Sequence, residues 1–586
     1  MQIKRLFDIL DNYSEAYPTQ DAALVSKVAG KWEKVSIQQY RERTDLYSCA
    51  MLALGIKAGD RVAIVCGSRP EWNMLDFAVM QIGAVSVPIY PTISHEDYEH
   101  ILNHAEMKML IFDSNHIWTR LETVLPKVKS LKHIFTVNEL GHGHKTLMEL
   151  ETLGGQNFDA AKLKKIKESI AETDLASIVY TSGTTGKQKG VMMSHKNIVN
   201  QILTMQEIPA KWSKKALSFL PLCHAYERML VYLYQYLGMS VYYAESLGTI
   251  AENIKDINPT MMSCVPRVLD KIYDKLFLSG ANLKFPQRQI YYWAFNQANI
   301  YKIEDRTLLE NIKHKIADKL IYSKWRAALG GNFDIVVSGG SAIRTQVAAF
   351  FSAIGMPIFE GYGLTETSPV IAVSWRGHHK RQAGTVGVPL PGVEVKIAEN
   401  GEIICRGHNV MLGYYKDPEL TKEVIDADGW FHTGDLGEFT PEGLLRVTGR
   451  LKSLFKTGFG KYVNPEVIEA KFSESPYIAN VLVVGENQKF AAALIVPEHD
   501  TLKHWCKDNN IAAKTLQELI ENKAVIELFK KEVKTYNALF GDYEQIKNFR
   551  LIAEEWTPDN FLSQTLKTKR KEVEKYYAKE IEKLFV

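Results

Sequence analysis

A loop rich in glycine, hydroxyl and lysine residues carries the strongest chemical signal in the sequence. It lies in Ser177–Val191 (SIVYTSGTTGKQKGV), where a short apolar run leads into three glycines, four hydroxyl residues and two lysines. Glycines let a backbone approach an anion closely, and amide, hydroxyl and ammonium groups can bind phosphate oxygens. The loop therefore predicts a phosphate-binding site, although a flexible surface turn has a similar composition.

The spacing of this loop excludes the P-loop of nucleoside triphosphatases. That motif places four residues between its glycines and follows the second glycine with Lys and Ser or Thr. Here only two residues separate Gly183 from Gly186, and Gln188 follows Lys187. Any triphosphate would have to be held in a different geometry.

Two further Gly-rich turns follow apolar runs that we expect to be strands. Asp334–Val337 leads into Gly339 and Gly340, and Pro357–Phe359 leads into a second turn. Ligands of open α/β sheets bind at the carboxyl ends of strands, where such turns lie. We therefore expect both turns to face the same site as the phosphate loop.

The phosphate loop resembles that of the adenylate-forming superfamily, which contains acyl-CoA synthetases, luciferases and the adenylation domains of peptide synthetases. Further motifs follow in the order typical of that family and span nearly the whole chain. They are SGGSA (338–342), EGYGLTETSP (360–369), GEIICRG (401–407), DGWFHTGDLG (428–437) and TGRLKSLFK (448–456). The long-chain fatty-acid branch is resembled in particular, through PLCHAYER (221–228), a helical insertion at about 271–331, and FKTGFGKYVNPEVIE (455–469).

The resemblance implies a ligase that consumes ATP. It would join a long-chain fatty acid to AMP with release of pyrophosphate, and would then pass the acyl group to coenzyme A, with Mg²⁺ as the cofactor. A carboxylate is already ionised near pH 7, so this first step needs no general base. Positioning and electrostatic stabilisation should dominate catalysis.

The resemblance assigns the phosphates and the metal to named residues. Glu366 would bind Mg²⁺, with Thr184 as a second metal ligand, and Thr365 would contact the α-phosphate. A carboxylate beside phosphate oxygens suits this hard cation. The β- and γ-phosphates would be held by Thr181, Ser182, Gly183, Thr184, Thr185, Gly186, Lys187 and Lys189.

The nucleoside would lie against the two Gly-rich turns. Asp435 would accept hydrogen bonds from the ribose hydroxyls, and Arg450 would be a second ribose contact. Tyr362 would stack on adenine, although a tyrosine at this position also suits a core. The remaining nucleotide contacts that the resemblance implies are Gly339, Gly340, Ser341, Glu360, Gly361 and Gly363.

Lys567 corresponds to the C-terminal lysine with which the family bridges the substrate carboxylate and the α-phosphate. The family pattern Gly-Lys-Ile-x-Arg is altered here to Leu566-Lys567-Thr568-Lys569-Arg570, so Lys569 and Lys571 are nearby competitors. The family's second step requires the C-terminal domain to turn, with Lys452 as the hinge. His224 would lie near the carboxylate entrance as a catalytic group, and a structural histidine is the alternative.

Three other functions share parts of this pattern. One is an acyl-AMP ligase that serves a carrier protein, and formation of acyl-CoA by the protein alone would exclude it. A second is a synthetase for an aryl or branched acid. The third is a non-catalytic lipid-binding protein, against which the retained Thr184, Glu366, Asp435, Arg450 and Lys567 argue.

Apolar runs that alternate with helical patterns predict the fold class. Strands are expected at Arg61–Gly67, Val85–Tyr90 and Lys108–Asp113. Helices are expected at Pro70–Ile82 and from about Ser94, where Ser94 and Asp97 would form a capping box. This βαβα order indicates an α/β fold with largely parallel, layered sheets.

A basic segment near Lys452, which leads into a smaller α+β pattern, predicts a boundary between two domains. Residues 1–450 would form a large adenylate-forming domain that binds ATP and the acyl group, and residues 451–586 a small, mobile α+β domain that carries the catalytic lysine. A helix is expected at Arg570–Val586, with Val573, Tyr577, Ile581 and Leu584 or Phe585 on one face. Met229–Ala244, the most apolar segment, is too short to span a bilayer and is expected to be a buried helix that runs into a strand.

Composition indicates an ordinary globular chain. Of 586 residues, 46% are hydrophobic and 24% charged, and the formal charge of +3 does not favour nucleic acid as a partner. Six scattered cysteines without a CxxC pair indicate free thiols, and no leader pattern is visible at the N-terminus. These features predict a cytoplasmic protein. Peripheral contact with the inner face of the membrane and a homodimer are left open.

Overall fold

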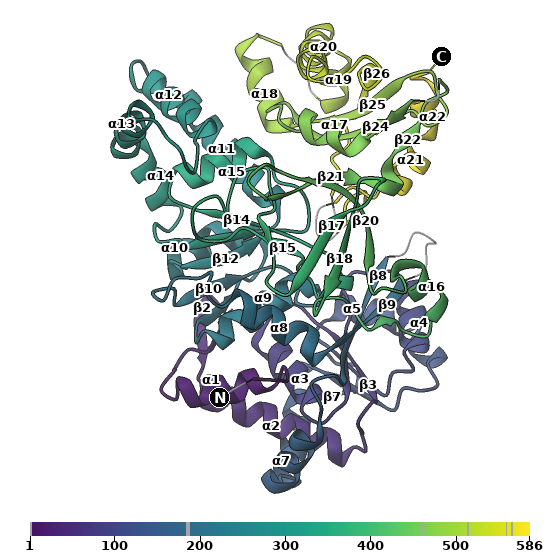
Figure 1. Cartoon of the computed structure of the whole chain (residues 1–586). Coiled ribbons are helices and arrows are strands. Elements are labelled where there is room, and N and C mark those ends of the chain that lie inside the picture. The colour runs from purple at the N-terminus through teal and green to yellow at the C-terminus, as the bar shows by residue number, and fades with distance from the viewer. Residues whose placement is uncertain are drawn as a thin grey trace.

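The computed structural model describes residues 3–182, 188–459, 461–511, 515–557, 560–563 and 567–585, without the side chains of Ser182, Leu247 and Lys452. Two large sheets with helices between and around them form most of the molecule (Figure 1). The sequence-based prediction of layered, largely parallel sheets is confirmed, because β3, β4, β5, β6, β7 and β8 pair in parallel in one sheet and β1, β10, β11, β12, β13 and β14 in the other.

The first sheet has the strand order β19-β9-β8-β4-β3-β5-β6-β7 in the described residues. Its central strands β3, β4 and β5 are buried at nearly every residue, as is typical of parallel strands whose sheet is covered by helices on both faces. The strands are β3 (Arg61–Val65), β4 (Val85–Pro88), β5 (Met109–Phe112), β6 (His133–Thr136), β7 (Lys145–Thr146), β8 (Leu175–Ser182), β9 (Gln188–Ser194) and β19 (Gly413–Tyr414).

The second sheet has the order β16-β15-β14-β13-β12-β10-β11-β1-β2. Both Gly-rich turns follow neighbouring central strands of this sheet, as expected. The strands are β1 (Leu24–Val28), β2 (Lys31–Val35), β10 (Lys215–Ser218), β11 (Ser240–Tyr243), β12 (Met261–Cys264), β13 (Ile335–Ser338), β14 (Ile358–Tyr362), β15 (Ala372–Val373) and β16 (Val388–Pro389).

Helices before residue 360 fill the space between and around the two sheets. They are α1 (Asp8–Ala16), α2 (Ile37–Ala53), α3 (Pro70–Met80), α4 (His95–His104), α5 (Asn115–Leu121), α6 (Leu147–Gln156), α7 (Ala160–Ser169), α8 (His195–Met205), α9 (Ala225–Tyr236), α10 (Ile250–Ile257), α11 (Pro266–Ser279), α12 (Gln287–Asn299), α13 (Leu308–Ala317), α14 (Ser323–Ala328) and α15 (Thr345–Ala353). The expected capping box of α4 is confirmed in part. The Ser94 side chain accepts a hydrogen bond from the amide of Asp97, but the Asp97 carboxylate accepts one from the Ser94 hydroxyl and not from its backbone amide.

A buried ion pair joins the two sheets. Arg228 of α9 contacts Asp76 of α3 at 2.6 Å, and it donates to the hydroxyl of Ser177 of β8 at 2.7 Å. Both charged side chains are almost fully buried, so the loss of either one would leave an uncompensated charge and cost about 3–5 kcal/mol. The pair therefore fixes α9 against the strand that leads into the phosphate loop.

The segment Met229–Ala244 is buried as a helix followed by a strand, as its sequence predicts. The helical insertion lies between β12 and β13 and contains α11 to α14. Its first helix begins at Pro266 and not near residue 271, because proline is favoured in the first turn of a helix. Among the described residues, no helix combines the length and apolar character needed to cross a membrane.

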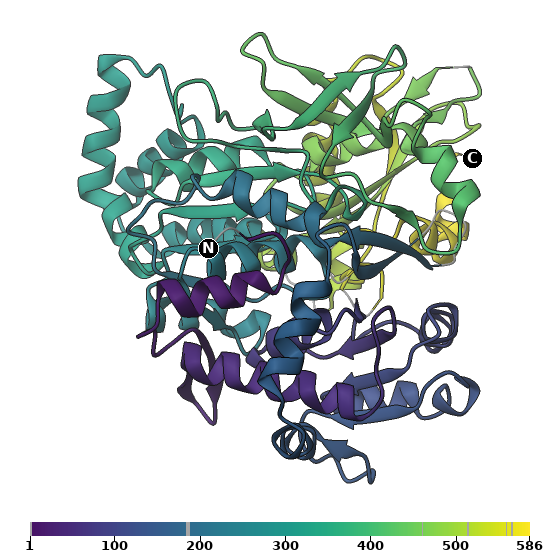
Figure 2. The ribbon, with the colours of Figure 1, turned by 60° about the horizontal axis from the view of Figure 1, so that its bottom comes forward.

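A third, antiparallel sheet follows, in the order β17-β18-β20-β21. After residue 450 the chain forms a small pair of strands and a three-stranded sheet with helices around it (Figure 1). Figure 2 shows these light green to yellow elements from another side, away from the purple N-terminal elements. The strands are β17 (Val393–Ile397), β18 (Glu402–Gly407), β20 (Phe431–Phe439), β21 (Leu445–Arg450), β22 (Phe455–Lys456), β23 (Tyr462–Val463), β24 (Ile478–Val484), β25 (Ala491–Pro497) and β26 (Ile546–Leu551). The helices are α16 (Pro418–Val424), α17 (Pro465–Phe472), α18 (His499–Asp508), α19 (Leu516–Glu521), α20 (Lys523–Asn537), α21 (Arg570–Tyr576) and α22 (Ala578–Glu582).

The prediction of one continuous C-terminal helix is wrong. Two short helices, α21 and α22, meet at Tyr577, whose backbone leaves the helical region. Tyr577 turns inward against Trp556 and Phe561, and this packing outweighs helix continuity. The predicted apolar face is nevertheless correct, because Val573, Tyr577 and Leu584 are buried, with Ile581 and Phe585 packed against them.

The six cysteines are free and buried, as expected for a chain that is not stabilised by disulfides. The residues after 454 build cores of their own around β24 and β25, apart from the cores of the sheets that precede them.

Candidate active site

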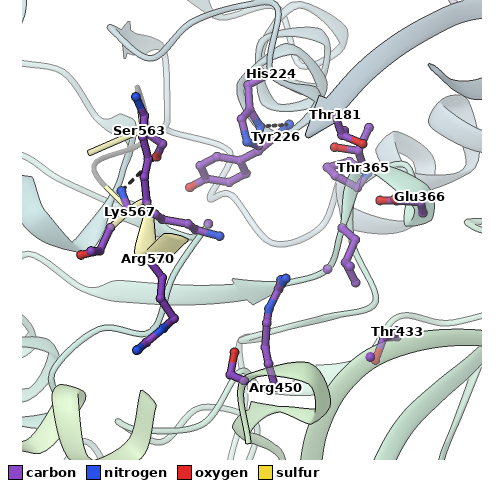
Figure 3. Close-up of a pocket in the computed structure, with 18 of the residues that line it drawn as sticks. Thr181, His224, Tyr226, Thr365, Glu366, Thr433, Arg450, Ser563, Lys567 and Arg570 are labelled. Carbon is purple, nitrogen blue, oxygen red and sulfur yellow. Dashed lines mark hydrogen bonds between the residues drawn. The ribbon is translucent and has the colours of Figure 1, made fainter. Parts of the chain in front are cut away.

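One large cavity, of about 2180 Å³, lies where the described strand ends of the second sheet meet the C-terminal elements. Its lining includes many of the residues singled out from the sequence, and Figure 3 labels six of them, Thr181, His224, Thr365, Glu366, Arg450 and Lys567. These residues are Thr181, Lys189, His224, Gly340, Gly361, Tyr362, Gly363, Thr365, Glu366, Arg450 and Lys567. Elements far apart in the sequence thus converge on a single site.

Some predicted residues lie elsewhere. Asp435 sits behind Tyr362 and Arg450, while Gly339, Ser341 and Glu360 are not among the lining residues. Gly183, Thr184, Thr185, Gly186 and Lys187, together with the side chain of Ser182, lie outside the described residues. Their predicted roles stay predictions.

The turn after β14 leaves no space for side chains at one of its glycines. A Cβ at Gly363 would lie 2.0 Å from the carbonyl oxygen of Pro369, so the backbone passes too closely for any other residue. The chain then enters a single helical turn, Thr365–Thr367, which directs Thr365 and Glu366 to the cavity. Glycine at 363 therefore serves to position the two side chains that follow it.

Glu366 belongs to a small polar cluster that the sequence did not reveal. The hydroxyl of Tyr414 donates to its carboxylate at 2.8 Å, and Lys189 lies 3.7 Å from the same oxygen. Lys189 also donates to the Tyr414 hydroxyl at 2.8 Å. Burial raises the pKa of Tyr414, and the neighbouring Glu366 carboxylate raises it further, so the phenol keeps its proton.

The position of Tyr414 follows from a strand pairing. β19 pairs antiparallel with β9, and this register places Tyr414 opposite Val191, beside the end of the phosphate loop. No spacing between Glu366 and Tyr414 along the chain predicts such proximity. Only the tertiary contact brings the tyrosine to the carboxylate.

Asp435 and Arg450 are cross-strand partners. They face each other in the pairing of β20 with β21, and the guanidinium Nε lies 2.9 Å from the Asp435 Oδ1 atom. The other carboxylate oxygen accepts a hydrogen bond of 2.9 Å from the Tyr362 hydroxyl. Burial raises the pKa of Asp435, and Arg450 partly offsets that rise.

His224 stands at the N-terminal end of α9 as its cap. Its Nδ1 atom accepts a hydrogen bond of 3.2 Å from the amide of Tyr226. Burial lowers the pKa of His224 to about 4, and the positive charge of Lys567 contributes. The imidazole is therefore neutral at pH 7, with its proton on Nε2 as a hydrogen-bond donor.

Lys567 reaches the cavity from the C-terminal elements, across from Thr365 and Glu366 (Figure 3). It is accessible through the cavity, yet protein surrounds it. Removal from bulk water lowers its pKa, Arg450 lowers it further, and Asp435 and Glu466 oppose the shift. Its competitor Lys569 lies 3.4 Å from Glu572, within its own segment.

The segment that carries Lys567 is held to the rest of the C-terminal part. The amide of Lys567 donates to the Ser563 hydroxyl at 3.0 Å. Three residues later, Arg570 pairs with Glu469 of α17 and donates to the carbonyl of Val483 at 2.8 Å. These contacts tie the lysine to α17 and β24.

Apolar side chains line another arm of the cavity. They come from α8 and the loop after it, from α9, and from strands β12, β13 and β14. The lining includes Met205, Ile208, Pro209, Met229, Leu230, Leu233, Met261, Ile335, Val337 and Phe359. The segment Met229–Ala244 thus contributes both to core packing and to the cavity wall.

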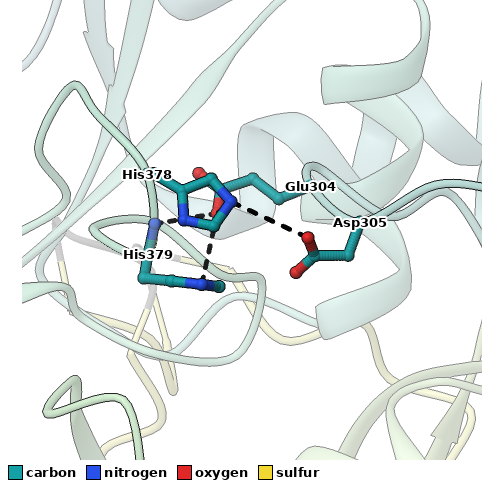
Figure 4. Close-up of side chains that lie close together, drawn as sticks. All are labelled: Glu304, Asp305, His378 and His379. Carbon is teal, nitrogen blue, oxygen red and sulfur yellow. Dashed lines mark hydrogen bonds and ion pairs between the residues drawn. The ribbon is translucent and has the colours of Figure 1, made fainter.

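Glu366 is not part of a ready-made metal cluster. Among the described residues, the one group of three or more His, Cys, Asp or Glu side chains close enough to share an ion is Glu304, Asp305, His378 and His379 (Figure 4). This group lies outside the cavity and joins the insertion to the loop between β15 and β16. A carboxylate such as Glu366 at the cavity nevertheless suits Mg²⁺, which binds proteins through one or two carboxylates plus phosphate oxygens.

The site thus combines a cavity at the strand ends of a layered α/β fold with a lysine from C-terminal elements that have cores of their own. A family model described as AMP-binding enzyme matches residues 10–415, and a model for the AMP-binding enzyme C-terminal domain matches residues 456–586. The chain belongs to the AMP-binding enzyme family.

Curated relatives cover almost the entire chain. It is 33% identical to the long-chain-fatty-acid–CoA ligase FadD15 of Mycobacterium bovis, over 95% of this chain and 93% of the relative. It is 31% identical to long-chain-fatty-acid–CoA ligase 1 of Cavia porcellus, over 94% and 82% of the two chains.

Solved structures share the fold. The adenylation domain of a carboxylate reductase from Mycobacterium chelonae matches with a TM-score of 0.76 and 21% identity, over 99% of this chain and 91% of that one. The anthranilate CoA ligase AuaEII, in complex with anthranoyl-AMP, matches with a TM-score of 0.74 and 18% identity, over 98% and 97%.

Proposed function

We propose that this protein activates long-chain fatty acids. ATP and the acid would form acyl-AMP and pyrophosphate, and coenzyme A would then take the acyl group and release AMP. The observation that carries the proposal is one cavity with a cationic, hydroxyl-bearing wall and an apolar arm. The names and coverage of the curated relatives support the same activity.

The polar wall fits a nucleoside triphosphate. The Thr181 hydroxyl is buried without a hydrogen-bond partner among the described residues, although buried polar atoms normally have one. A phosphate oxygen would supply that partner, and Lys189 and Arg450 would balance the charge. Mg²⁺ would be held by Glu366 and the phosphates, with Thr184 as a further ligand, and would neutralise charge on the phosphate oxygens.

In the first step, a carboxylate oxygen of the fatty acid attacks the α-phosphorus as the bond to pyrophosphate breaks. Two anions must be brought together, and the cationic Lys567 and Arg450 reduce their repulsion. The neutral His224 offers its Nε2 proton to the acyl carboxylate without adding charge. Tyr362, already bonded to Asp435, would hold that carboxylate ready for the ribose hydroxyls.

The second step requires Lys567 to withdraw so that the thiol of coenzyme A can reach the carbonyl carbon and displace AMP. We propose that residues 451–586 turn as a unit about Lys452, directly after β21 ends at Arg450. In the present arrangement this unit docks through contacts to backbone carbonyls. Arg344 donates to Ser473 at 3.0 Å and Gln346 to Glu474 at 3.3 Å.

The apolar arm would bind the hydrocarbon chain by removing it from water. Each buried methylene contributes about 0.8 kcal/mol, which corresponds to about a fourfold change in kcat/KM per methylene. Chain length should therefore matter strongly until the arm is filled. An aryl acid would leave much of this arm empty.

The test is pyrophosphate release by the purified protein with ATP and Mg²⁺, for acids from acetate to oleate, with and without coenzyme A. Release that rises with chain length, and acyl-CoA that forms when coenzyme A is present, would support the proposal. Release without acyl-CoA would redirect the second step to a carrier protein. No release with any acid would refute the proposed activity.

A further inference from the structure

The helical insertion exposes large apolar side chains that a globular protein normally buries. Of the 20 exposed large hydrophobic residues in the described chain, eight lie between residues 285 and 320. Leu308 is 79% exposed and Leu309 is 60% exposed. The eight are Phe285, Ile290, Ile300, Leu308, Leu309, Ile312, Ile316 and Leu320. We refer to them together as the insertion face.

The spacing of these residues gives α13 an apolar side that points to solvent. Leu309, Ile312 and Ile316 are three and four residues apart, so they lie on one side of the helix. Leu320 extends the row in the wider helical turn Asp318–Tyr322. Within α13 only Ala317 is buried, so the helix does not use this side to pack against the core.

The same segment is strongly basic. Residues 271–331 contain 11 lysines and arginines against five aspartates and glutamates, a net charge of +6 in a chain whose total is +3. Lys313, Lys315 and Lys319 lie on α13 and the turn that follows it, beside the apolar row. An outward apolar stripe flanked by cations is typical of helices that lie in the surface of an anionic membrane.

Charge also decides between the two simplest partners. A second copy of the chain would bring together two segments 271–331, each with a net charge of +6, and like charges in contact oppose association. A bilayer with anionic headgroups complements the lysines and accepts the leucines and isoleucines at the same time. We propose that the insertion face docks the protein on an anionic lipid surface.

Contacts connect this face to the apolar arm of the cavity. Glu304, just before α13, accepts a hydrogen bond of 2.8 Å from the amide of His379 (Figure 4). In the same loop, Arg376 donates to the carbonyl of Ile208, which lines the arm. Docking would thus hold a segment that is linked to the wall of the acyl arm at the lipid surface. This benefit rests on the proposed function, because it presumes a substrate that partitions into lipid.

The experiment is co-sedimentation of the full chain with vesicles of phosphatidylcholine, with and without phosphatidylglycerol. The wild-type protein should bind the anionic vesicles, and added salt should weaken the binding. The triple variant Leu309→Ser, Ile312→Ser, Ile316→Ser should lose at least about tenfold in affinity. Lys313→Glu, Lys315→Glu, Lys319→Glu should lose roughly a hundredfold, since each basic residue contributes near an anionic surface.

A matched control removes exposed apolar residues elsewhere. Met148→Ser, Phe158→Ser, Leu539→Ser should bind the vesicles like the wild type. The docking proposal is overturned if the wild-type protein ignores anionic vesicles, or if both insertion variants bind as it does. It is also overturned if the wild type is a dimer that the leucine–isoleucine variant converts to a monomer, because a second copy would then cover the face.

A separate readout distinguishes this proposal from the proposed function. Pyrophosphate release with a water-soluble acid such as octanoate should be the same in all variants, which also shows that each one folds. Loss of vesicle binding with unchanged release would support the docking surface. Absence of release in the wild type would refute the activity, while the vesicle assay would still decide the docking surface.

Discussion

Replacement of Lys567 by alanine tests the proposed chemistry most directly. In the structure its ammonium group faces the cavity, close enough to Asp435, Arg450 and His224 for their charges to affect one another. It would lie between two anions that must come together. The loss of one such preorganised group typically costs about 10²–10³ in rate, or roughly 2.7–4 kcal/mol.

The structure favours this range over a larger effect. Arg450 is a second cation at the same site and remains when Lys567 is removed. We therefore expect adenylation by Lys567→Ala to fall by about 10²–10³. Reaction of supplied acyl-AMP with coenzyme A should change little, because in the proposed mechanism the lysine has left the site for that step.

The assay measures the two half-reactions separately: pyrophosphate release from ATP and palmitate, and acyl-CoA formation from palmitoyl-AMP. Lys569→Ala is the matched control, because Lys569 pairs with Glu572 and is two residues away. Normal adenylation by Lys567→Ala, or an equal loss in the control, would refute the assignment. Equal losses in both half-reactions would contradict the proposed exchange of position.

Four further outcomes are expected. Lys452→Pro should leave adenylation largely intact and block thioester formation, because proline restricts the proposed hinge; equal losses in both steps would contradict the hinge. Tyr414→Phe should raise the Mg²⁺ concentration required for half-maximal pyrophosphate release, because Glu366 loses the hydrogen-bond donor that orients it. An unchanged Mg²⁺ requirement would mean that Tyr414 does not position a metal ligand. Met261→Trp should lower kcat/KM for palmitate at least about tenfold and leave kcat/KM for octanoate unchanged. Met261 lines the arm three residues before the end of β12, about 10 Å from the strand end, so only a long chain would reach it. An equal loss with both acids would argue against a chain-length role. Finally, burial lowers the pKa of His195 to about 3. Between pH 6.5 and 3 only the unfolded chain binds a proton at this residue, so the free energy of unfolding should decrease by about 1.4 kcal/mol for each unit by which the pH is lowered. The free energies of urea unfolding at pH 7 and pH 5 should therefore differ less in His195→Gln than in the wild type.

Local sequence patterns were sufficient to predict the strands and turns around the site. Apolar runs that end in glycine located β13 and β14, and the serine at 94 located the start of α4, because these signals act within a few residues. The two ribose candidates, Asp435 and Arg450, came from separate motifs. Their contact arises from the register of β20 and β21, which the sequence does not encode locally.

Contacts between residues far apart in the sequence could not be predicted from local patterns. Tyr414 reaches Glu366 through the pairing of β19 with β9, and the helix break at Tyr577 depends on Trp556. The insertion was expected as a helical segment, but its exposed side was not. An amphipathic helix looks the same in sequence whether its apolar side faces a core or the solvent.

The division of the hydrophobic cores fits the proposed role of Lys567 in one of two steps. The C-terminal elements bury their own apolar residues around β24 and β25, so a turn of this unit need not expose a shared core. Its described contacts with the larger part include polar ones, such as those of Arg344 and Gln346 to backbone carbonyls, which water can replace at little net cost. Within the unit, by contrast, Arg570 and Glu469 hold the segment of Lys567 to α17. The lysine would therefore move with the whole unit, and its presence in the cavity would be tied to one orientation of that unit.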